Sequence, residues 1–196
     1  MAAEMTDGRR VRRSRSRQRI VDAAVVLATE RGLEPTADRV AELAEITPRT
    51  VFRHFEDMEA LQREIFADFQ ARTEALRVAY DPQRGWREQL DELVLRRTKI
   101  FERYTRHILY SQAMRLNSPV VEADMQAYFL RMRKSLKLRL PPEFAAKRSA
   151  FAAMEAVLGW EMWLRLRRDQ KLSIKQATEV VQNLVDALLA QHGVME

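Results

Sequence analysis

The 196-residue sequence predicts an all-α protein of about nine helices. Residues that favour helices dominate it, and its apolar residues recur at intervals of three and four. No run of alternating β-branched residues suggests a strand. The six prolines and five glycines are few, and the prolines mark several breaks between helix-sized segments. We expect a basic arm over residues 1–16, a small helical domain over 17–62 and a larger helical domain over 63–196.

An arginine-rich arm comes first. Seven arginines and no acidic residue lie between Arg9 and Arg19. A segment with so much charge and so few apolar residues should be disordered when it is free. The net charge of +6 and the pI near 10.0 favour a polyanionic partner, and such an arm can reach backbone phosphates or a minor groove. The alternative is a solvated tail without a function.

Two short helices joined by a tight turn are predicted over residues 36–55, after an opening helix that begins near residue 18. Thr36 is an N-cap candidate for the first of the pair. Three apolar positions at i, i+3 and i+4 give this helix one face to bury, namely Val40, Leu43 and Ala44. Thr47 can cap the second helix, and Pro48 occupies its first position, where a missing N–H does no harm.

The second helix has an inward and an outward face. Val51 and Phe55 point inward, which leaves arginine, threonine and histidine side chains on the opposite face. Arginine can give two hydrogen bonds to guanine, threonine can contact a thymine methyl group, and histidine can bind phosphate. The geometry is that of a helix-turn-helix with residues 48–55 as recognition helix. The candidate DNA-binding residues are Arg15, Arg17, Arg39, Thr47, Arg49, Thr50, Arg53 and His54.

The stretch from Gln18 to Leu61, which ends in VFRHFEDMEAL, resembles the DNA-binding domain of the tetracycline-repressor (TetR) family. The family usually has glycine in the turn, where this chain has Glu45. It also usually has tyrosine in place of Phe52 and lysine in place of Met58. Both of the latter commonly contact phosphate in the family, so the resemblance implies that His54 and the arm carry more of the phosphate contacts here.

Further helix-sized segments follow over residues 57 to about 80, 86 to 103, 105 to 116, 118 to 141 and 143 to 168. The segment that starts at Ser118 has a cap followed by proline at the first helical position. The last helix opens at Ser173, with Gln176 three residues on, which is a capping box. The number and order of these segments also resemble the TetR family.

The last two helices suggest a dimer. From Phe151 to Leu164 the apolar positions run almost all round the helix, and the final helix carries a continuous apolar stripe. The family resemblance implies that these helices pair with their copies in a four-helix interface. A two-fold dimer would present two recognition helices to a palindrome with half-sites roughly 34 Å apart. The alternative is an ordinary bundle within one protomer.

The middle helices suggest a chamber for a small, largely apolar effector. Arg97 lies in the middle of an apolar helix face, and a buried arginine needs a partner. That partner is either Glu155 or Glu161, which we favour, or an anionic group of the effector. The candidate effector-binding residues are Arg97, Phe101, Tyr104, Met114, Phe129, Trp160 and Trp163. For any one of the aromatic residues, a place in the core is the simpler interpretation.

The sequence predicts no enzyme, no catalytic residue, no metal site and no cofactor. The three histidines are scattered, the glycines form no phosphate-binding loop, and no serine lies in a nucleophile elbow. His107 should be a surface residue. Cysteine is absent, which excludes disulfides and thiolate metal sites. No signal peptide or membrane-spanning run is evident, because Glu155 and Glu161 interrupt the longest apolar candidate, so we expect a cytoplasmic protein.

These patterns predict a ligand-responsive DNA-binding transcriptional regulator. The family resemblance favours a homodimeric repressor that a small effector releases from a palindromic double-stranded operator. Two alternatives remain. A constitutive or architectural DNA-binding protein would show no ligand-dependent loss of operator binding. A basic helical enzyme would bind nucleic acid without sequence preference.

Overall fold

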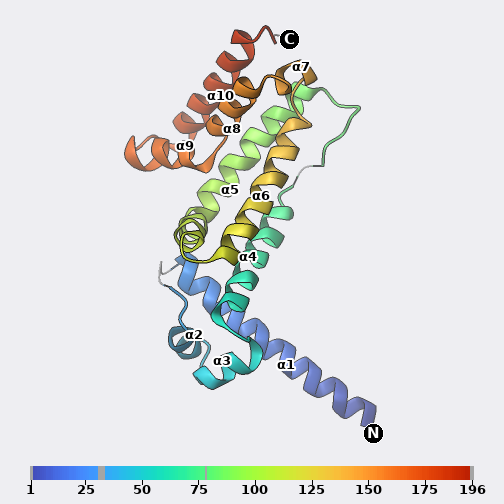
Figure 1. The fold of residues 1–196 in the computed structure, drawn as a ribbon, viewed down its shortest axis with the longest axis vertical. Coiled ribbons are helices and arrows are strands. Elements are labelled where there is room, and N and C mark those ends of the chain that lie inside the picture. Colours follow the sequence, from blue (N-terminus) through green and yellow to red (C-terminus); the bar gives the residue numbers. More distant parts are fainter. Residues whose placement is uncertain (1, 31–33, 78, 195–196) are drawn as a thin grey trace. The chain divides into compact units, whose positions relative to one another are not determined.

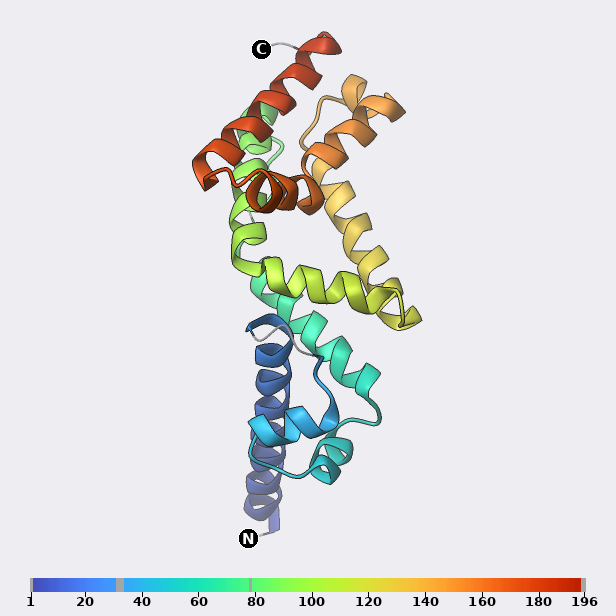
Figure 2. The same ribbon diagram turned by 90° about the vertical axis from the view of Figure 1, so that its left-hand side faces the viewer.

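The computed structural model describes residues 2–30, 34–77 and 79–194, and within these ranges the fold is all-α (Figures 1 and 2). Ten α-helices and two π-helical turns occur there, and no strand. No helix in these ranges is both long enough and apolar enough to cross a membrane. The chain forms two compact units. The first comprises Met1–Arg72 and Arg106–Met125, and the second comprises Thr73–Thr105 and Gln126–Glu196.

The first unit begins with helix α1 (Ala2–Val25) and a π-helical turn (Val26–Glu30). The arm that we expected to be disordered is part of α1, so that expectation is wrong for the described backbone. Arginine favours helices, and no proline separates the arm from the apolar residues that anchor the rest of α1. The arm therefore continues the helix.

Three more helices complete the helix-turn-helix part of this unit: α2 (Ala37–Leu43), α3 (Pro48–His54) and α4 (Met58–Glu74). Helix α2 packs against both α1 and α3 (Figure 2). The predicted inward residues form the core, together with positions from α1 and α4: Ile20, Ala24, Leu27, Val40, Ala41, Val51, Phe55, Leu61 and Ile65. Tyr110 also packs against this core, which is why the first unit extends beyond the domain expected over 17–62.

The turn between α2 and α3 is a Schellman motif. The N–H of Ile46 donates to the carbonyl of Ala41 at 2.9 Å, and that of Glu45 donates to the carbonyl of Glu42 at 3.2 Å. Glu45 has φ 53°, the left-handed conformation that glycine adopts without strain. The turn therefore keeps the conformation of a glycine turn with a glutamate in the strained position.

The second unit contains the first part of α5 (Trp86–Arg115), most of α6 (Pro119–Lys137), α7 (Pro142–Ala145), α8 (Arg148–Val157), α9 (Trp160–Leu164), a π-helical turn (Arg165–Asp169) and α10 (Ile174–Gln191). The expected break between residues 103 and 105 coincides with a kink in α5 at Tyr104, which has φ −118° and ψ 16°. The capping box of Ser173 and Gln176 is confirmed at the start of α10. Helix α8 packs against α10 (Figure 1).

The prediction of a single helix over residues 143 to 168 is wrong, because the helical conformation is interrupted twice within this range. Lys147 adopts an extended conformation between α7 and α8, and Gly159 does the same between α8 and α9. A Cβ atom at Gly159 would lie 3.0 Å from Glu161 Oε2 and 3.1 Å from the carbonyl oxygen of Ala156. Glycine therefore permits the close approach at the second break. Helix α4 likewise ends at Glu74, earlier than expected.

Replacing Glu45 with glycine should raise the free energy of unfolding by about 0.5–1 kcal/mol, because the left-handed conformation strains a residue that has a Cβ atom. Urea unfolding measures this difference. Glu45→Ala is the control, since alanine keeps the strain and should give no gain. A glycine variant less stable than the wild type would mean that the exposed ion pair of Glu45 with Arg19, at 4.0 Å, outweighs the strain.

Candidate functional site

Helix α3 is fixed at its start by Thr47 and Pro48. The hydroxyl of Thr47 accepts the N–H of Thr50 at 3.3 Å, and the two threonine hydroxyls lie 3.1 Å apart. Pro48 occupies the first turn, as predicted. These contacts set the direction of α3, and the burial of Val51 sets its rotation about its axis. Thr47 therefore caps the helix by accepting the N–H of Thr50, and it remains exposed at the helix surface.

The outward face of α3 carries two arginines and an aromatic ring. Arg49, Phe52 and Arg53 are all exposed, and Phe52 has 51% of its surface accessible. Residues three and four apart lie side by side on a helix, so this face combines guanidinium donors with an apolar surface. From the sequence, Phe52 is notable only because it replaces the tyrosine usual in the family. Phe52 directly follows the buried Val51 in a helix whose buried side is set by Val51 and Phe55, so helical periodicity could have placed it on the outward face.

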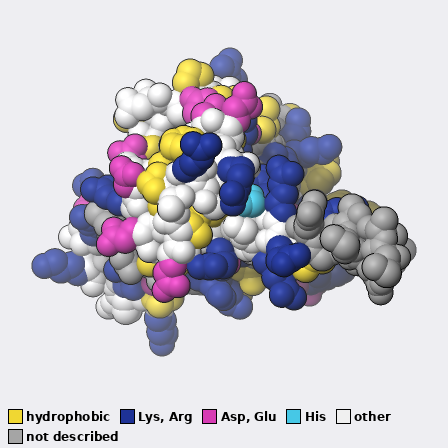
Figure 3. Space-filling model, turned by 90° about the horizontal axis from the view of Figure 1, so that it is seen from below, with side chains coloured by type: hydrophobic (Ala, Val, Ile, Leu, Met, Phe, Trp, Pro, Cys, Tyr) yellow, Lys and Arg dark blue, Asp and Glu magenta, His cyan; other side chains and the backbone are white. Residues whose placement is uncertain are grey.

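Further basic residues lie at the surface of the first unit, and Figure 3 shows Lys and Arg side chains gathered on the side of the molecule seen from below. Those of α1 are exposed at Arg10, Arg12, Arg13 and Arg15. On α2, Arg39 is exposed and donates to the carbonyl of Glu34 at 3.2 Å. The predicted residues Arg15, Arg39, Arg49 and Arg53 therefore all lie at the surface of the first unit. Arg13 was not predicted, because its position depends on α1 being helical this far forward.

His54 lies at the end of α3 among these charges. Partial burial lowers its pKa, and the positive charges of Arg53, Arg13 and Arg17 lower it further. The imidazole is therefore neutral at pH 7 and can donate one N–H to an anion. A phosphate placed against it would favour the protonated form.

Arg17 and Arg19 form hydrogen bonds that link α1 to other parts of the first unit. The guanidinium of Arg17 donates to Glu64 Oε1 at 2.6 Å and stacks on the ring of Phe55 at 4.2 Å. Arg19 donates to the carbonyl of Ala44 at the end of α2. Arg17 is predicted from the sequence as a DNA contact, and the structure also gives it partners inside the protein. A pairing between residues 47 positions apart left no signal in the sequence.

His107 is buried, so the expectation of a surface histidine is wrong. It is only 3% exposed and stacks on Phe69, with ring centroids 4.3 Å apart and planes 15° apart. Burial, and to a lesser extent the charge of Arg72, lowers its pKa to about 4. The ring is therefore a neutral part of the core at physiological pH. Among the described residues, no three His, Cys, Asp or Glu side chains are grouped to hold a metal ion.

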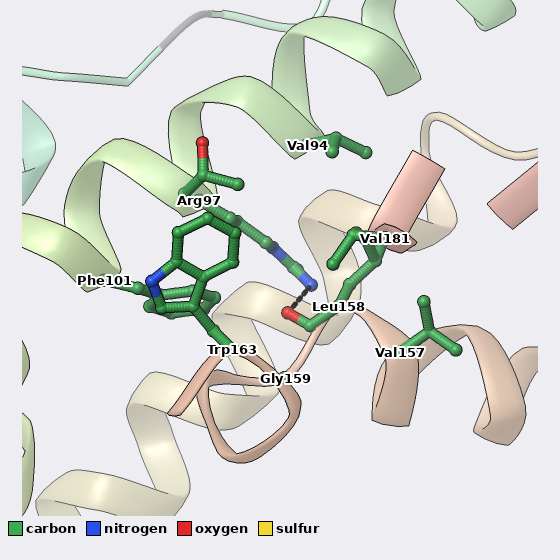
Figure 4. A pocket seen from close by; sticks show the side chains of 9 residues that line it. Val94, Arg97, Phe101, Val157, Leu158, Gly159, Trp163 and Val181 are labelled. Atoms are coloured by element: carbon green, nitrogen blue, oxygen red, sulfur yellow. Dashed lines mark hydrogen bonds between the residues drawn. The ribbon is translucent and has the colours of Figure 1, made fainter. Parts of the chain in front are cut away.

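The structure brings three of the predicted effector residues together at one cavity. Arg97, Phe101 and Trp163 line a cavity of about 10 Å³, which is close to the volume that one water needs (Figure 4). Among the other four, Met114 belongs to the first unit, Tyr104 lies at the kink of α5, Phe129 is exposed and Trp160 is partly buried. The cavity at Arg97 is too small for an organic effector unless side chains move.

Arg97 itself is held by backbone carbonyls. One Nη atom donates to the carbonyl of Leu158 at 3.1 Å (Figure 4). The other donates to the carbonyl of Met132 at 3.2 Å. Leu158 is the C-cap of α8, where carbonyls lack helical partners because the chain breaks at Gly159. Arg97 therefore caps α8 and ties it to α5 and α6.

The prediction that Arg97 pairs with Glu155 or Glu161 is thus wrong. Glu155 forms an ion pair with Arg133 at 3.4 Å, and Glu161 is exposed. With only 5% of its surface exposed, Arg97 is a buried cation, and burial lowers its pKa to about 10. This shift corresponds to a penalty on the order of 3 kcal/mol at pH 7. The penalty decreases only as the pH rises above about 10, since the unfolded chain holds this proton more tightly.

Trp163 also has a structural partner. Its Nε1–H donates to Glu102 Oε1 at 2.9 Å, and Arg167 donates to the same oxygen at 2.7 Å. The hydrogen bonds from Arg167 and Trp163 lower the pKa of Glu102, the former more strongly. This network holds α9 and the following π-helical turn against α5.

Comparisons with known proteins bear on the first unit most directly. Residues 20–65 match the sequence profile described as bacterial regulatory proteins, tetR family. A search of curated proteins found no significant match. A crystal structure from Rhodococcus sp., described as a TetR-family transcriptional regulator, superposes with a TM-score of 0.68 at 17% identity, and covers 89% of this chain and 99% of that one. The profile and the helix-turn-helix cover the same residues, so residues 20–65 form a DNA-binding domain of the kind found in the tetR family of bacterial regulatory proteins.

Proposed function

We propose that the protein is a homodimeric repressor that binds a palindromic operator through α3 and leaves it when a small effector binds. One observation carries the DNA part of this proposal. The outward face of α3 presents Arg49 and Arg53 to solvent, and neither forms an ion pair with another described residue. Guanidinium groups without an internal partner are available for guanine edges in a major groove.

The remaining surface residues have roles that follow from their chemistry. Phe52 would contact a thymine methyl group, since an exposed ring on this face has no polar atom to offer. Arg10, Arg13 and Arg15 would bind backbone phosphates, because all three are exposed on α1 and the charge of Arg13 reaches His54 at the end of α3. His54 would donate its N–H to a phosphate and gain a proton there.

The dimer would form through α8 and α10. Within one protomer, α10 buries Ala177, Val181, Val185 and Leu189. Ile174 and Leu184 extend this apolar stripe and are still exposed, at 50% and 36%, and α8 exposes small residues at Ala152 and Ala156. A second copy would cover these apolar surfaces in a four-helix arrangement, and its symmetry would match that of a palindrome.

Effector release requires a ligand whose affinity differs between the DNA-bound conformation and another conformation of the dimer. The second unit offers a kinked α5, a small cavity and a buried cation as places where a ligand could shift this balance. A titration of the protein and its operator with candidate ligands tests this part of the proposal. Operator binding that no ligand changes would favour a constitutive DNA-binding protein.

Arg49→Ala and Arg53→Ala should each remove roughly 1–3 kcal/mol of discrimination at one base pair, because each would remove a bidentate interaction with guanine. Competition binding with operators that carry single base changes measures this effect. Arg168→Ala, which removes an exposed arginine from the second unit, is the control. A double variant with unchanged thermal unfolding and full operator discrimination would exclude α3 as the recognition helix.

Replacing Arg10, Arg13 and Arg15 together with glutamine should weaken binding to all duplexes and reduce the slope of log K against log salt, by up to about 0.9 for each phosphate that the protein no longer neutralises. Sequence preference should remain, since these residues would bind phosphates. Fluorescence anisotropy over a range of salt concentrations gives the slope. An unchanged slope would mean that this part of α1 is a solvated helix without a role in binding.

Leu184→Glu should give monomers, because it places a charge in the proposed interface while the protomer core beneath it stays intact. Sedimentation velocity at micromolar concentration measures the change. Leu184→Ala should remain dimeric, and Val185→Glu should unfold the protomer instead, since Val185 is only 1% exposed. A folded, dimeric Leu184→Glu protein would place the interface elsewhere.

A further inference from the structure

Three arginines lie within electrostatic reach of one another in the second unit. Arg97 and Arg139 are 5% and 4% exposed, and Arg96 is partly buried. Burial is the largest influence on all three and lowers their pKa values. Like charges lower them further, since Arg96 and Arg139 both act on Arg97, and Arg96 acts on Arg139. The unit therefore concentrates positive charge in a place where water does not screen it.

The acidic residues whose charges reach this cluster are already paired with other arginines. The pairs are Glu155 with Arg133 at 3.4 Å, Glu92 with Arg84 at 2.5 Å and Glu74 with Arg77 at 2.8 Å. Within the described ranges, no carboxylate lies within 4.0 Å of a nitrogen of Arg96 or Arg97. Most buried charges in proteins are paired, so this arrangement departs from the usual one.

Two donors in the cluster also lack acceptors. The Nε atoms of Arg96 and Arg97 are buried, and neither has a hydrogen-bond partner among the described residues. The Nη atoms of Arg97 are fixed by the carbonyls of Leu158 and Met132, so its guanidinium is held in place without the help of a carboxylate. Tyr128 lies within electrostatic reach of both arginines.

We propose that Arg96 and Arg97 form a binding site for the carboxylate of a small organic acid. The free Nε–H of Arg97 would bind a carboxylate oxygen, the nearby charge of Arg96 would attract the same group, and the ligand's charge would compensate the buried cations. The fork of Arg97 is already occupied, so neither a carboxylate nor a phosphate can use its paired donors, and of the two groups the smaller carboxylate suits the limited space beside Arg97.

The site must open to admit this ligand. The cavity beside Arg97 measures about 10 Å³, which leaves room for roughly one water. Arg96 is the more exposed of the two arginines, and its buried Nε donates to no described residue. The acid therefore enters from the side of Arg96, and its binding changes the packing around α5. This inference names the effector class of the proposed regulator and depends on that proposal only for its effect on DNA.

Calorimetric titration of the full-length protein tests the site, with benzoate, phenyl phosphate and benzamide as probes at constant ionic strength. We expect saturable binding of benzoate, weaker binding of phenyl phosphate and no binding of benzamide, which has the same shape without the charge. Benzoate should also raise the thermal unfolding midpoint, because a ligand of the folded state stabilises it. Equal binding of benzoate and benzamide, or binding of neither anion, would overturn the proposal.

Variants of Arg96 separate the site from general charge effects. Arg96→Gln should weaken benzoate binding by about tenfold or more, and Arg96→Lys should restore part of it. Lys99→Gln is the matched control, since it removes one positive charge from an exposed position on the same helix and should leave the affinity unchanged. Arg96 is preferable to Arg97 for this test, because Arg97 also caps α8. Unchanged affinity in a folded Arg96→Gln protein would exclude the site.

The same titrations with operator DNA present distinguish this proposal from the regulatory one. If benzoate binds at Arg96 and operator affinity stays constant, the proposed carboxylate site is supported. The proposed release of the operator is then contradicted for carboxylic acids. If neutral compounds release the operator while no anion binds, the ligand response stands and the carboxylate site is overturned.

Discussion

The burial of Val51 and Phe55 in the core of the first unit is the contact on which the DNA-binding account depends. These two residues fix the rotation of α3, and the four-residue spacing between them leaves Arg49, Phe52 and Arg53 facing outward. The Schellman turn at Glu45 then sets where α3 begins, at some cost in backbone strain. A short helix of seven residues is held in place by these contacts and not by its own stability.

In the second unit, Arg97 of α5 supplies the hydrogen bond that the end of α8 lacks. Gly159 interrupts the chain between α8 and α9, which leaves the carbonyl of Leu158 without a helical partner, and Arg97 donates to it from α5. The bond satisfies the helix end but leaves the positive charge uncompensated. In the proposed carboxylate site, an anion would remove a desolvation penalty that the folded protein otherwise carries.

Local signals predicted the helices of the first unit and the start of α10, because N-caps, proline positions and apolar spacing act within a few residues. The breaks at Lys147 and Gly159 gave weaker signals, and the helical arm was missed because charge composition outweighed the helix propensity of arginine. Partners distant in sequence could not be predicted. The bond from Arg97 to the carbonyl of Leu158 leaves no trace in side-chain chemistry, since every residue has a carbonyl.

Selection of binding sites from random duplex DNA, with binding repeated at several salt concentrations, tests the central claim most directly. If α3 is the recognition helix of a two-fold dimer, the selected sequences will share a palindrome with half-sites about one helical turn apart, and guanines will occupy positions that arginine can read. Binding that depends strongly on salt but selects no sequence would contradict this account, since it would reduce the basic face of the first unit to a non-specific contact with phosphates.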